Sequence, residues 1–174
     1  MLMNSSIAAN FFLKKGKKED IPITIMKLLK LVYIAHGWAL AILENKLGIL
    51  NGEEVEAWKH GPVIPSLYHE FKHYHNTPIE EWSQTTIDET DNGFELKAIF
   101  FEDADINDKK ILEEILNTVW ESYKEYSAWG LSRKTHESGT PWEKAWKNKN
   151  RCISNDSIKA YYTSYLKEMT GASE

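Results

Sequence analysis

The chain has 174 residues, enough for one domain with a sizeable core, and it contains no Gly/Ser-rich or Pro-rich linker that would separate two domains. Its formal net charge of −5 at neutral pH argues against a protein whose whole surface binds DNA or RNA. The single cysteine, Cys152, permits no internal disulfide and fits a reducing compartment. The charged stretch from Lys14 to Asp20 interrupts any apolar signal segment, so we expect a cytoplasmic, single-domain protein.

A helix within residues 1–20 is expected first, and the longest apolar segment of the chain follows at residues 24–43, where Thr24 would cap a second helix. Beyond Lys30 its apolar side chains cover nearly the whole circumference, which is typical of a helix buried on all sides. A membrane span needs about 20 apolar residues, and Lys27, Lys30 and His36 break this run. The segment is therefore predicted to be the central core helix, and no membrane contact is expected.

The next element in the chain is predicted to be a β-hairpin around Asn51-Gly52, because Asn-Gly between two strand-like runs is a strong turn signal. Its strands would cover about 47–50 and 53–58. Pro65 then opens a helix, and the stretch after it is polar and acidic, with a second turn expected at Asp91-Asn92-Gly93.

Four helical signals complete the chain, and in one of them Ser127 starts a short helix that stops near Ser138-Gly139. Apolar residues at helical spacing predict a helix that Asn107 caps and that extends to residue 123. A short helix would start at Thr140-Pro141, and a last helix would cover 154–174. The expected fold is mainly α: a single compact helical domain around the buried central helix (about 24–43), with a small β-hairpin (about 47–58).

One motif resembles a catalytic metal site. Residues 69–73 read H-E-F-K-H, and on a helix the pattern H-E-x-x-H places two imidazoles one turn apart, where they can share a zinc ion, with Glu70 as a general base. Catalytic zinc requires a third protein ligand, and His75 would point elsewhere on such a helix. A zinc-dependent hydrolase using His69 and His73 is therefore retained as an alternative function, and no metal is assigned.

Other catalytic patterns are missing from the sequence. It contains neither a phosphate-binding G-x-x-x-x-G-K-[ST] motif nor a dinucleotide-binding G-x-G-x-x-G motif, and no Ser or Cys has a Gly-flanked elbow around it. His36 lies within the apolar helix and is interpreted as a hydrogen-bonded core residue. The sequence therefore predicts a protein that is not an enzyme and has no cofactor. No nucleic-acid partner is expected, because residues 80–114 are mainly acidic.

Four segments together carry a family resemblance. They are K-L-L-K-L-V-Y-I-A-H-G-W (27–38), E-A-W-K-H-G-P-V-I-P (56–65), L-Y-H-E-F-K (67–72), and Thr135-His136 with Pro141-Trp142. In this pattern the sequence resembles the Panacea domain family of SocA-like antitoxins and phage-associated proteins. The resemblance covers about residues 24–146 and leaves the first and last helices outside it.

The resemblance implies a mainly α domain that neutralises a protein toxin by direct contact, in one type of the family as an adaptor that delivers the toxin to the protease ClpXP. A phage or mobile-element factor that binds another host protein is the remaining alternative. We expect the partner to bind near the segment that joins the predicted ribbon to the next helix, at Trp58, His60, Gly61, Pro62, Val63 and Tyr68. The other residues of the pattern are interpreted as structural: Lys27, Tyr33, His36, Trp38, Glu56, Thr135, His136 and Trp142.

Overall fold

The computed structural model describes residues 3–43, 47–84, 86–90 and 93–171. Within these ranges the helices are α1 (Ser5–Glu19), α2 (Ile25–Ile42), α3 (Pro65–Phe71), the 3₁₀ helix η1 (Lys72–Tyr74), α4 (Lys109–Tyr123), α5 (Ala128–Thr135), α6 (Pro141–Lys147) and α7 (Asn155–Thr170). The strands are β1 (Val55–Trp58), β2 (Gly61–Val63), β3 (Thr86–Thr90), β4 (Gly93–Lys97) and β5 (Cys152–Ile153). The mainly α fold class is confirmed.

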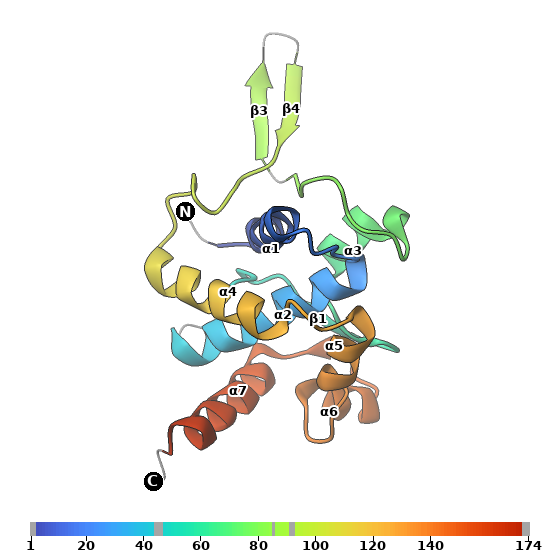
Figure 1. Cartoon of the computed structure of the whole chain (residues 1–174). Helices are drawn as coiled ribbons and strands as arrows, with labels where there is room; N and C mark the ends of the chain where they lie inside the picture. Colours follow the sequence, from blue (N-terminus) through green and yellow to red (C-terminus); the bar gives the residue numbers. More distant parts are fainter. Residues whose placement is uncertain (1–2, 44–46, 85, 91–92, 172–174) are drawn as a thin grey trace.

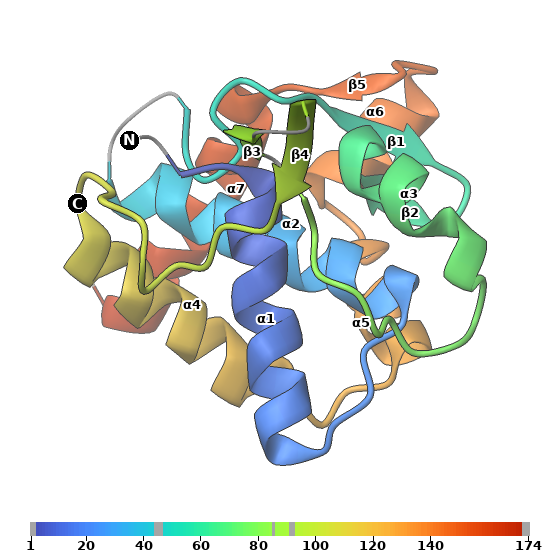
Figure 2. The same ribbon diagram turned by 90° about the horizontal axis from the view of Figure 1, so that it is seen from above.

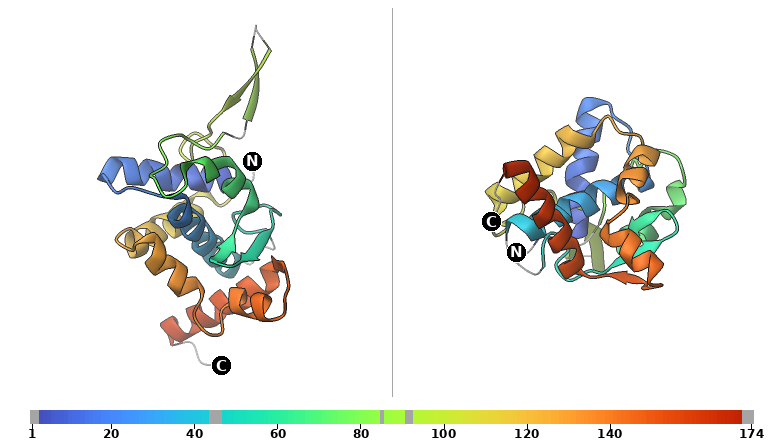
Figure 3. Two further views of the ribbon diagram at one scale, coloured as in Figure 1. Left: turned by 90° about the vertical axis from the view of Figure 1, so that its right-hand side faces the viewer. Right: turned by 90° about the horizontal axis from the view of Figure 1, so that it is seen from below.

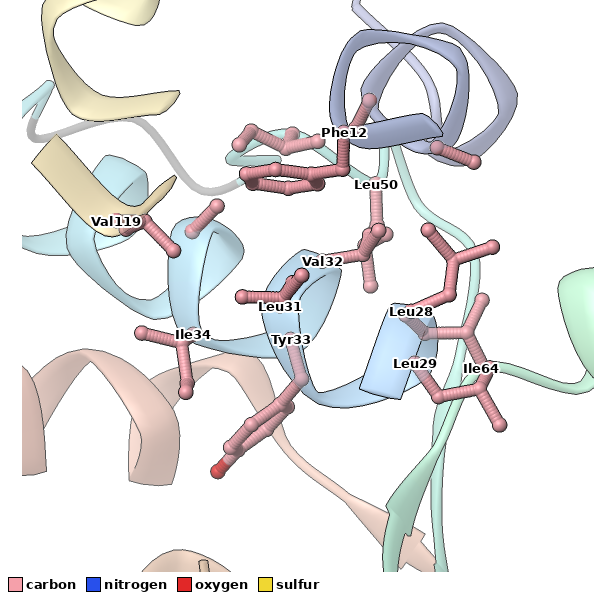
Figure 4. Packing of buried hydrophobic residues seen from close by; sticks show 14 of the residues in the cluster. Phe12, Leu28, Leu29, Leu31, Val32, Tyr33, Ile34, Leu50, Ile64 and Val119 are labelled. Carbon is pink, nitrogen blue, oxygen red and sulfur yellow. The ribbon is translucent and has the colours of Figure 1, made fainter. Parts of the chain in front are cut away.

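Helix α2 runs through the centre of the molecule, with α1 on one side and α7 on the other (Figure 1). It contacts α1, α3, α4, α5, α7 and β2, and the view from above shows α1 crossing over it (Figure 2). Its apolar side chains point outward in several directions: Leu31 and Val32 lie below Phe12 of α1, whereas Tyr33 and Ile34 point toward α7 (Figure 4). The predicted central core helix is therefore confirmed.

Helix α2 is also long and apolar enough to cross a membrane, with a mean hydropathy of 1.5 over 18 residues, but 83% of those residues are buried inside the protein. That degree of burial is expected of the core helix of a globular domain. Thr24 precedes α2 as predicted, yet its side chain makes no capping hydrogen bond. Its backbone instead forms an isolated bridge with Pro78, which ties the start of α2 to the loop after η1.

The small β-hairpin is present, but it lies further along the chain than expected. Strands β1 and β2 pair antiparallel across the two-residue turn Lys59-His60, and β5 pairs with the other edge of β1. The predicted strand at 47–50 is wrong, because this segment forms a turn in which Ile49 and Leu50 are fully buried. Asn51-Gly52 does bend the chain with positive φ angles, but it leads from a core-packed turn into β1 rather than joining two paired strands.

A second hairpin projects from the helical body beyond α1 (Figure 1). Strands β3 and β4 pair in register from Thr86↔Lys97 to Thr90↔Gly93. Two residues of the turn predicted here, Asp91 and Asn92, lie outside the described residues. The side view shows the same projection, with α7 at the opposite end of the molecule (Figure 3).

Of two predicted helix starts, the one at Thr140 is confirmed and the one at Asn107 is wrong. The predicted N-cap Asn107 is wrong, because the N-cap of α4 is Asp108, whose side chain makes no capping bond. Thr140 does cap α6 by accepting a hydrogen bond from the Glu143 N–H at 3.3 Å, while the Glu143 carboxylate accepts one from the Gly139 N–H at 2.9 Å. These two bonds satisfy backbone N–H groups at the start of α6.

Candidate functional site

The segments that carry the sequence pattern meet at the β1–β2 turn, defined as residues 58–63. Trp58 and Gly61 are opposite each other in the hairpin, with Lys59 and His60 exposed between them. Gly61 has a φ of +106° and is buried, and a Cβ atom there would lie 2.9 Å from the Lys30 Nζ. Glycine is therefore required both by the backbone angle and by the closeness of Lys30.

Side chains from α2, α5 and α6 hold the backbone carbonyl groups of this turn. The pairs are Trp142 Nε1 to Trp58 O (2.8 Å), His136 Nε2 to Lys59 O (3.4 Å), Ser132 Oγ to His60 O (2.9 Å) and Lys30 Nζ to Pro62 O (2.8 Å). The His136 ring also packs on the Trp142 indole, with 3.9 Å between their centroids. The turn is thus fixed by tertiary contacts rather than by its own hydrogen bonds alone.

Lys30 is the most unusual group of the site. Its side chain is 1% exposed, and burial lowers the pKa of its amine from the usual 10.5 to about 7. Burying an ammonium group is costly because it loses its hydration, so the neutral amine is favoured more than on a surface. The hydrogen bond to Pro62 O offsets part of the cost of burying the amine, and it joins the core helix to the turn.

The outward side of the turn presents two aromatic rings. Trp58 and Tyr68 are half-buried and pack edge to face, with centroids 4.7 Å apart. Trp58 Nε1 donates to a carboxylate oxygen of Glu56 at 2.6 Å, and the other oxygen of Glu56 lies 3.0 Å from Arg151 Nε. The Trp58 bond, followed by the Arg151 guanidinium, lowers the pKa of the Glu56 carboxyl. Glu56 is thereby fixed as an anion that orients the indole.

The residues predicted to bind a partner therefore differ in accessibility. His60 is exposed, and Trp58 and Tyr68 are half-buried, whereas Gly61, Pro62 and Val63 are buried. The last three shape and support the turn and offer little side-chain surface to another protein. A contact surface here would consist of His60 and the Trp58–Tyr68 pair.

Several of the residues interpreted as structural are buried or pack against the core. Lys27 is buried and donates to the Lys124 carbonyl, and Tyr33 is buried beside Tyr162. Trp38 also packs edge to face on Tyr162, with 5.2 Å between centroids. Thr135 is buried and donates to the Ser132 carbonyl at 2.9 Å. The contacts of Lys27, Tyr33 and Trp38 join α2 to the end of α4 and to α7, whereas the Thr135 bond lies within α5.

His36 is a buried histidine with a hydrogen-bond partner on each ring nitrogen. It is fully buried, its Nε2 lies 2.9 Å from Asn155 Oδ1, and its Nδ1 faces the Leu50 N–H at 3.4 Å. Burial lowers the pKa of the imidazole to about 4. The ring therefore stays neutral at physiological pH, donating through Nε2 and accepting through Nδ1.

The H-E-x-x-H motif does not form the geometry of a zinc site. Helix α3 ends at Phe71, so His73 lies on η1 instead of one turn along the same α-helix, and both His69 and His73 are exposed. Glu70 accepts hydrogen bonds from Ser83 Oγ (2.7 Å) and from the Gln84 N–H (2.9 Å). In the described ranges no three His, Cys, Asp or Glu side chains gather to hold a metal ion. The zinc-hydrolase alternative is therefore not supported.

Ser132 and Asn10 also make bonds that no predicted motif includes. Ser132 holds the His60 carbonyl, and its helical spacing from Thr135 and His136 was a signal that could have indicated it. Asn10 bonds to Ser83 and Ile99, which are distant in sequence, and no local pattern indicates such a contact.

Comparisons with known proteins agree with the pattern at this site. The family model for the antitoxin SocA-like Panacea domain matches residues 28–143, which include Lys30, the β1–β2 turn and Trp142. Antitoxin SocA of Caulobacter vibrioides (strain NA1000 / CB15N) is 32% identical over 141 residues, which are 81% of this chain and 69% of that protein. No solved structure matches the chain. The chain belongs to the SocA-like antitoxin family that carries the Panacea domain.

Proposed function

We propose that this protein is a cytoplasmic antitoxin that neutralises a protein toxin by direct, non-catalytic contact. Membership of the SocA-like antitoxin family is the observation that carries the proposal. The fold is consistent with it, because the β1–β2 turn is built as a fixed structural unit whose backbone groups are bonded to core side chains. A surface that is rigid before binding loses less conformational entropy when a partner docks.

The test is co-expression with the product of the adjacent gene. The expected result is that the toxin alone arrests growth, that this protein restores growth, and that the two proteins co-purify. A variant with a broken core, Leu31→Asp, serves as a negative control because Leu31 is fully buried. Absence of both rescue and complex would contradict the proposal for that pair. A complex with a different host protein, without rescue, would favour a mobile-element factor of the same fold.

We further propose that the bound toxin is delivered to a protease such as ClpXP. This step rests on the family resemblance and separates an adaptor from an antitoxin that acts by sequestration alone. The measurement is the half-life of the toxin with and without this protein, in cells that contain or lack the protease. An adaptor shortens the half-life when the protease is present, whereas a sequestering antitoxin leaves it unchanged or lengthens it.

A further inference from the structure

The β3–β4 hairpin presents a large apolar surface to solvent. Phe94 is 78% exposed and Leu96 is 55% exposed, and because side chains alternate along a strand, both lie on the same face of β4. Among the described strands, none pairs with this ribbon from outside. An isolated two-stranded ribbon is marginally stable in water, and exposed apolar patches of this kind mark interaction sites. The hairpin therefore has the properties of a contact element.

The base of the hairpin is fixed to the body, although strands β3 and β4 project away from it (Figure 3). Asn10 of α1 is fully buried and bonds to the segment before β3 and to the segment after β4. Its Nδ2 donates to Ser83 O (2.9 Å) and to Ile99 O (3.0 Å). Its Oδ1 accepts from the Ser83 N–H at 2.7 Å. The Glu70 carboxylate also accepts hydrogen bonds from Ser83 and Gln84 in the segment before β3. The direction of the hairpin is thus set by buried polar groups, which is a form of preorganisation.

Charge is distributed unevenly between the hairpin region and the rest of the chain. Residues 80–108 contain ten acidic residues and one lysine, a net charge of −9, whereas the remaining residues contain 16 acidic and 20 basic side chains, a net charge of +4. The exposed Glu95 is on β4 itself. At the base, Lys14 of α1 pairs with Glu102 at 3.0 Å and offsets part of this charge. An acidic projection attracts a basic surface and repels nucleic acid and anionic membranes.

We infer that the β3–β4 hairpin contacts the toxin, with Phe94 and Leu96 in an apolar depression of a positively charged toxin surface. This inference rests on the proposed antitoxin function and names the element that recognises the partner. The β1–β2 turn alone offers a small surface, since most of its residues are buried. The hairpin adds two large apolar side chains of the kind that contribute most to binding at the centre of an interface.

The experiment measures the affinity of purified variants for the toxin encoded by the adjacent gene, after binding by the wild-type protein has been established. The double variant Phe94→Ser/Leu96→Ser is expected to bind about tenfold or more weakly. Glu95→Lys should associate more slowly at low salt, and its rate should depend less on ionic strength. The matched control is Met169→Ser, because Met169 is 68% exposed on α7 at the opposite end of the molecule (Figure 1) and should not alter affinity. Circular dichroism checks that each variant folds.

The outcomes separate this inference from the proposed function. If the wild-type protein binds the toxin and the double variant binds equally well, the hairpin inference is overturned and the antitoxin function stands. If the wild-type protein does not bind, both are overturned for that toxin. A dimer of this chain that dissociates in the double variant, with unchanged toxin affinity, would assign the hairpin to a second copy instead and would also overturn the inference.

Discussion

At the residue scale, Lys30 combines full burial with a structural hydrogen bond, and this combination predicts a pH dependence. Its folded-state pKa is lowered to about 7, so between pH 7 and 10.5 the unfolded chain holds a proton that the folded protein has released. Stability therefore rises with pH across this range. Between pH 7 and 9 we expect the wild-type free energy of unfolding to rise by roughly 2 kcal/mol more than that of Lys30→Met, at about 1.4 kcal/mol per pH unit and per proton.

Urea unfolding at pH 7 and pH 9 measures this difference. Lys110→Met is the control, because Lys110 is exposed on α4 and its removal should leave the pH dependence of the wild type intact. An identical pH dependence in the wild type and in Lys30→Met would show that the buried amine is not the group that titrates.

His36 predicts a pH dependence of the same sign in the acid range. Because its folded-state pKa is lowered to about 4, the unfolded chain gains a proton between pH 6.5 and 4 that the folded protein does not take up. Stability therefore falls as the pH decreases through this window. Between pH 7 and pH 5 we expect His36 to lower the free energy of unfolding by about 2 kcal/mol. His36→Gln should remove that part of the loss. The exposed His69→Gln should retain it, as measured by urea unfolding at both pH values.

At the scale of elements, the helices could be predicted from the sequence, because the signals that define them are local. Apolar residues at helical spacing indicated α4, the sequence Thr140-Pro141 marked the start of α6, and the long apolar run gave α2 within a residue or two at each end. Each of these signals depends on residues within a few positions of one another, so one sequence is sufficient to recognise it.

The β-structure and the site could not be predicted to the same extent. Asn51-Gly52 has the local signature of a hairpin turn, yet Ile49 and Leu50 before it are packed in the core, and tertiary burial overrides the local preference. The pairing of β1 with β5 joins segments about a hundred residues apart. The bonds from Lys30 and Trp142 to the β1–β2 turn likewise exist only after α2 and α6 have packed around it.

The anchoring of the β3–β4 hairpin gives a prediction at this scale. Asn10→Ala removes three hydrogen bonds and leaves the Ser83 N–H and the Ser83 and Ile99 carbonyl groups without the partner they have in the wild type. Each unsatisfied buried polar group costs about 1–3 kcal/mol before the structure relaxes. We therefore expect urea unfolding to show that the variant has lost roughly 2 kcal/mol or more of its free energy of unfolding. Asn117→Ala on α4, whose bond to the Glu113 carbonyl is exposed, should change stability by less than about 0.5 kcal/mol. Equal effects in the two variants would contradict the anchoring role.

At the scale of the whole molecule, α2 decides how the chain unfolds. Within the described residues, α1, α3, α4, α5, α7 and β2 all contact this one helix, so the core of the helical body is built around it. The charged and polar groups of α2 extend the same connections, since Lys27 reaches the end of α4, Lys30 reaches β2 and His36 reaches α7. A core shared in this way favours one cooperative unit over separate subdomains.

We therefore predict that the helical body unfolds in a single transition. Tryptophans lie on several elements, among them Trp38 on α2, Trp58 on β1, Trp120 on α4 and Trp142 on α6, so their fluorescence reports on much of the body. Its urea transition should coincide with that of helical circular dichroism. Leu31→Ala at the fully buried centre of α2 should shift both transitions together, by about 2–5 kcal/mol. The projecting hairpin should exchange its amide hydrogens at lower free energy than the body, because all residues of β4 are exposed. Two separated transitions, or a Leu31→Ala shift in one probe alone, would instead indicate that the domain consists of independent parts.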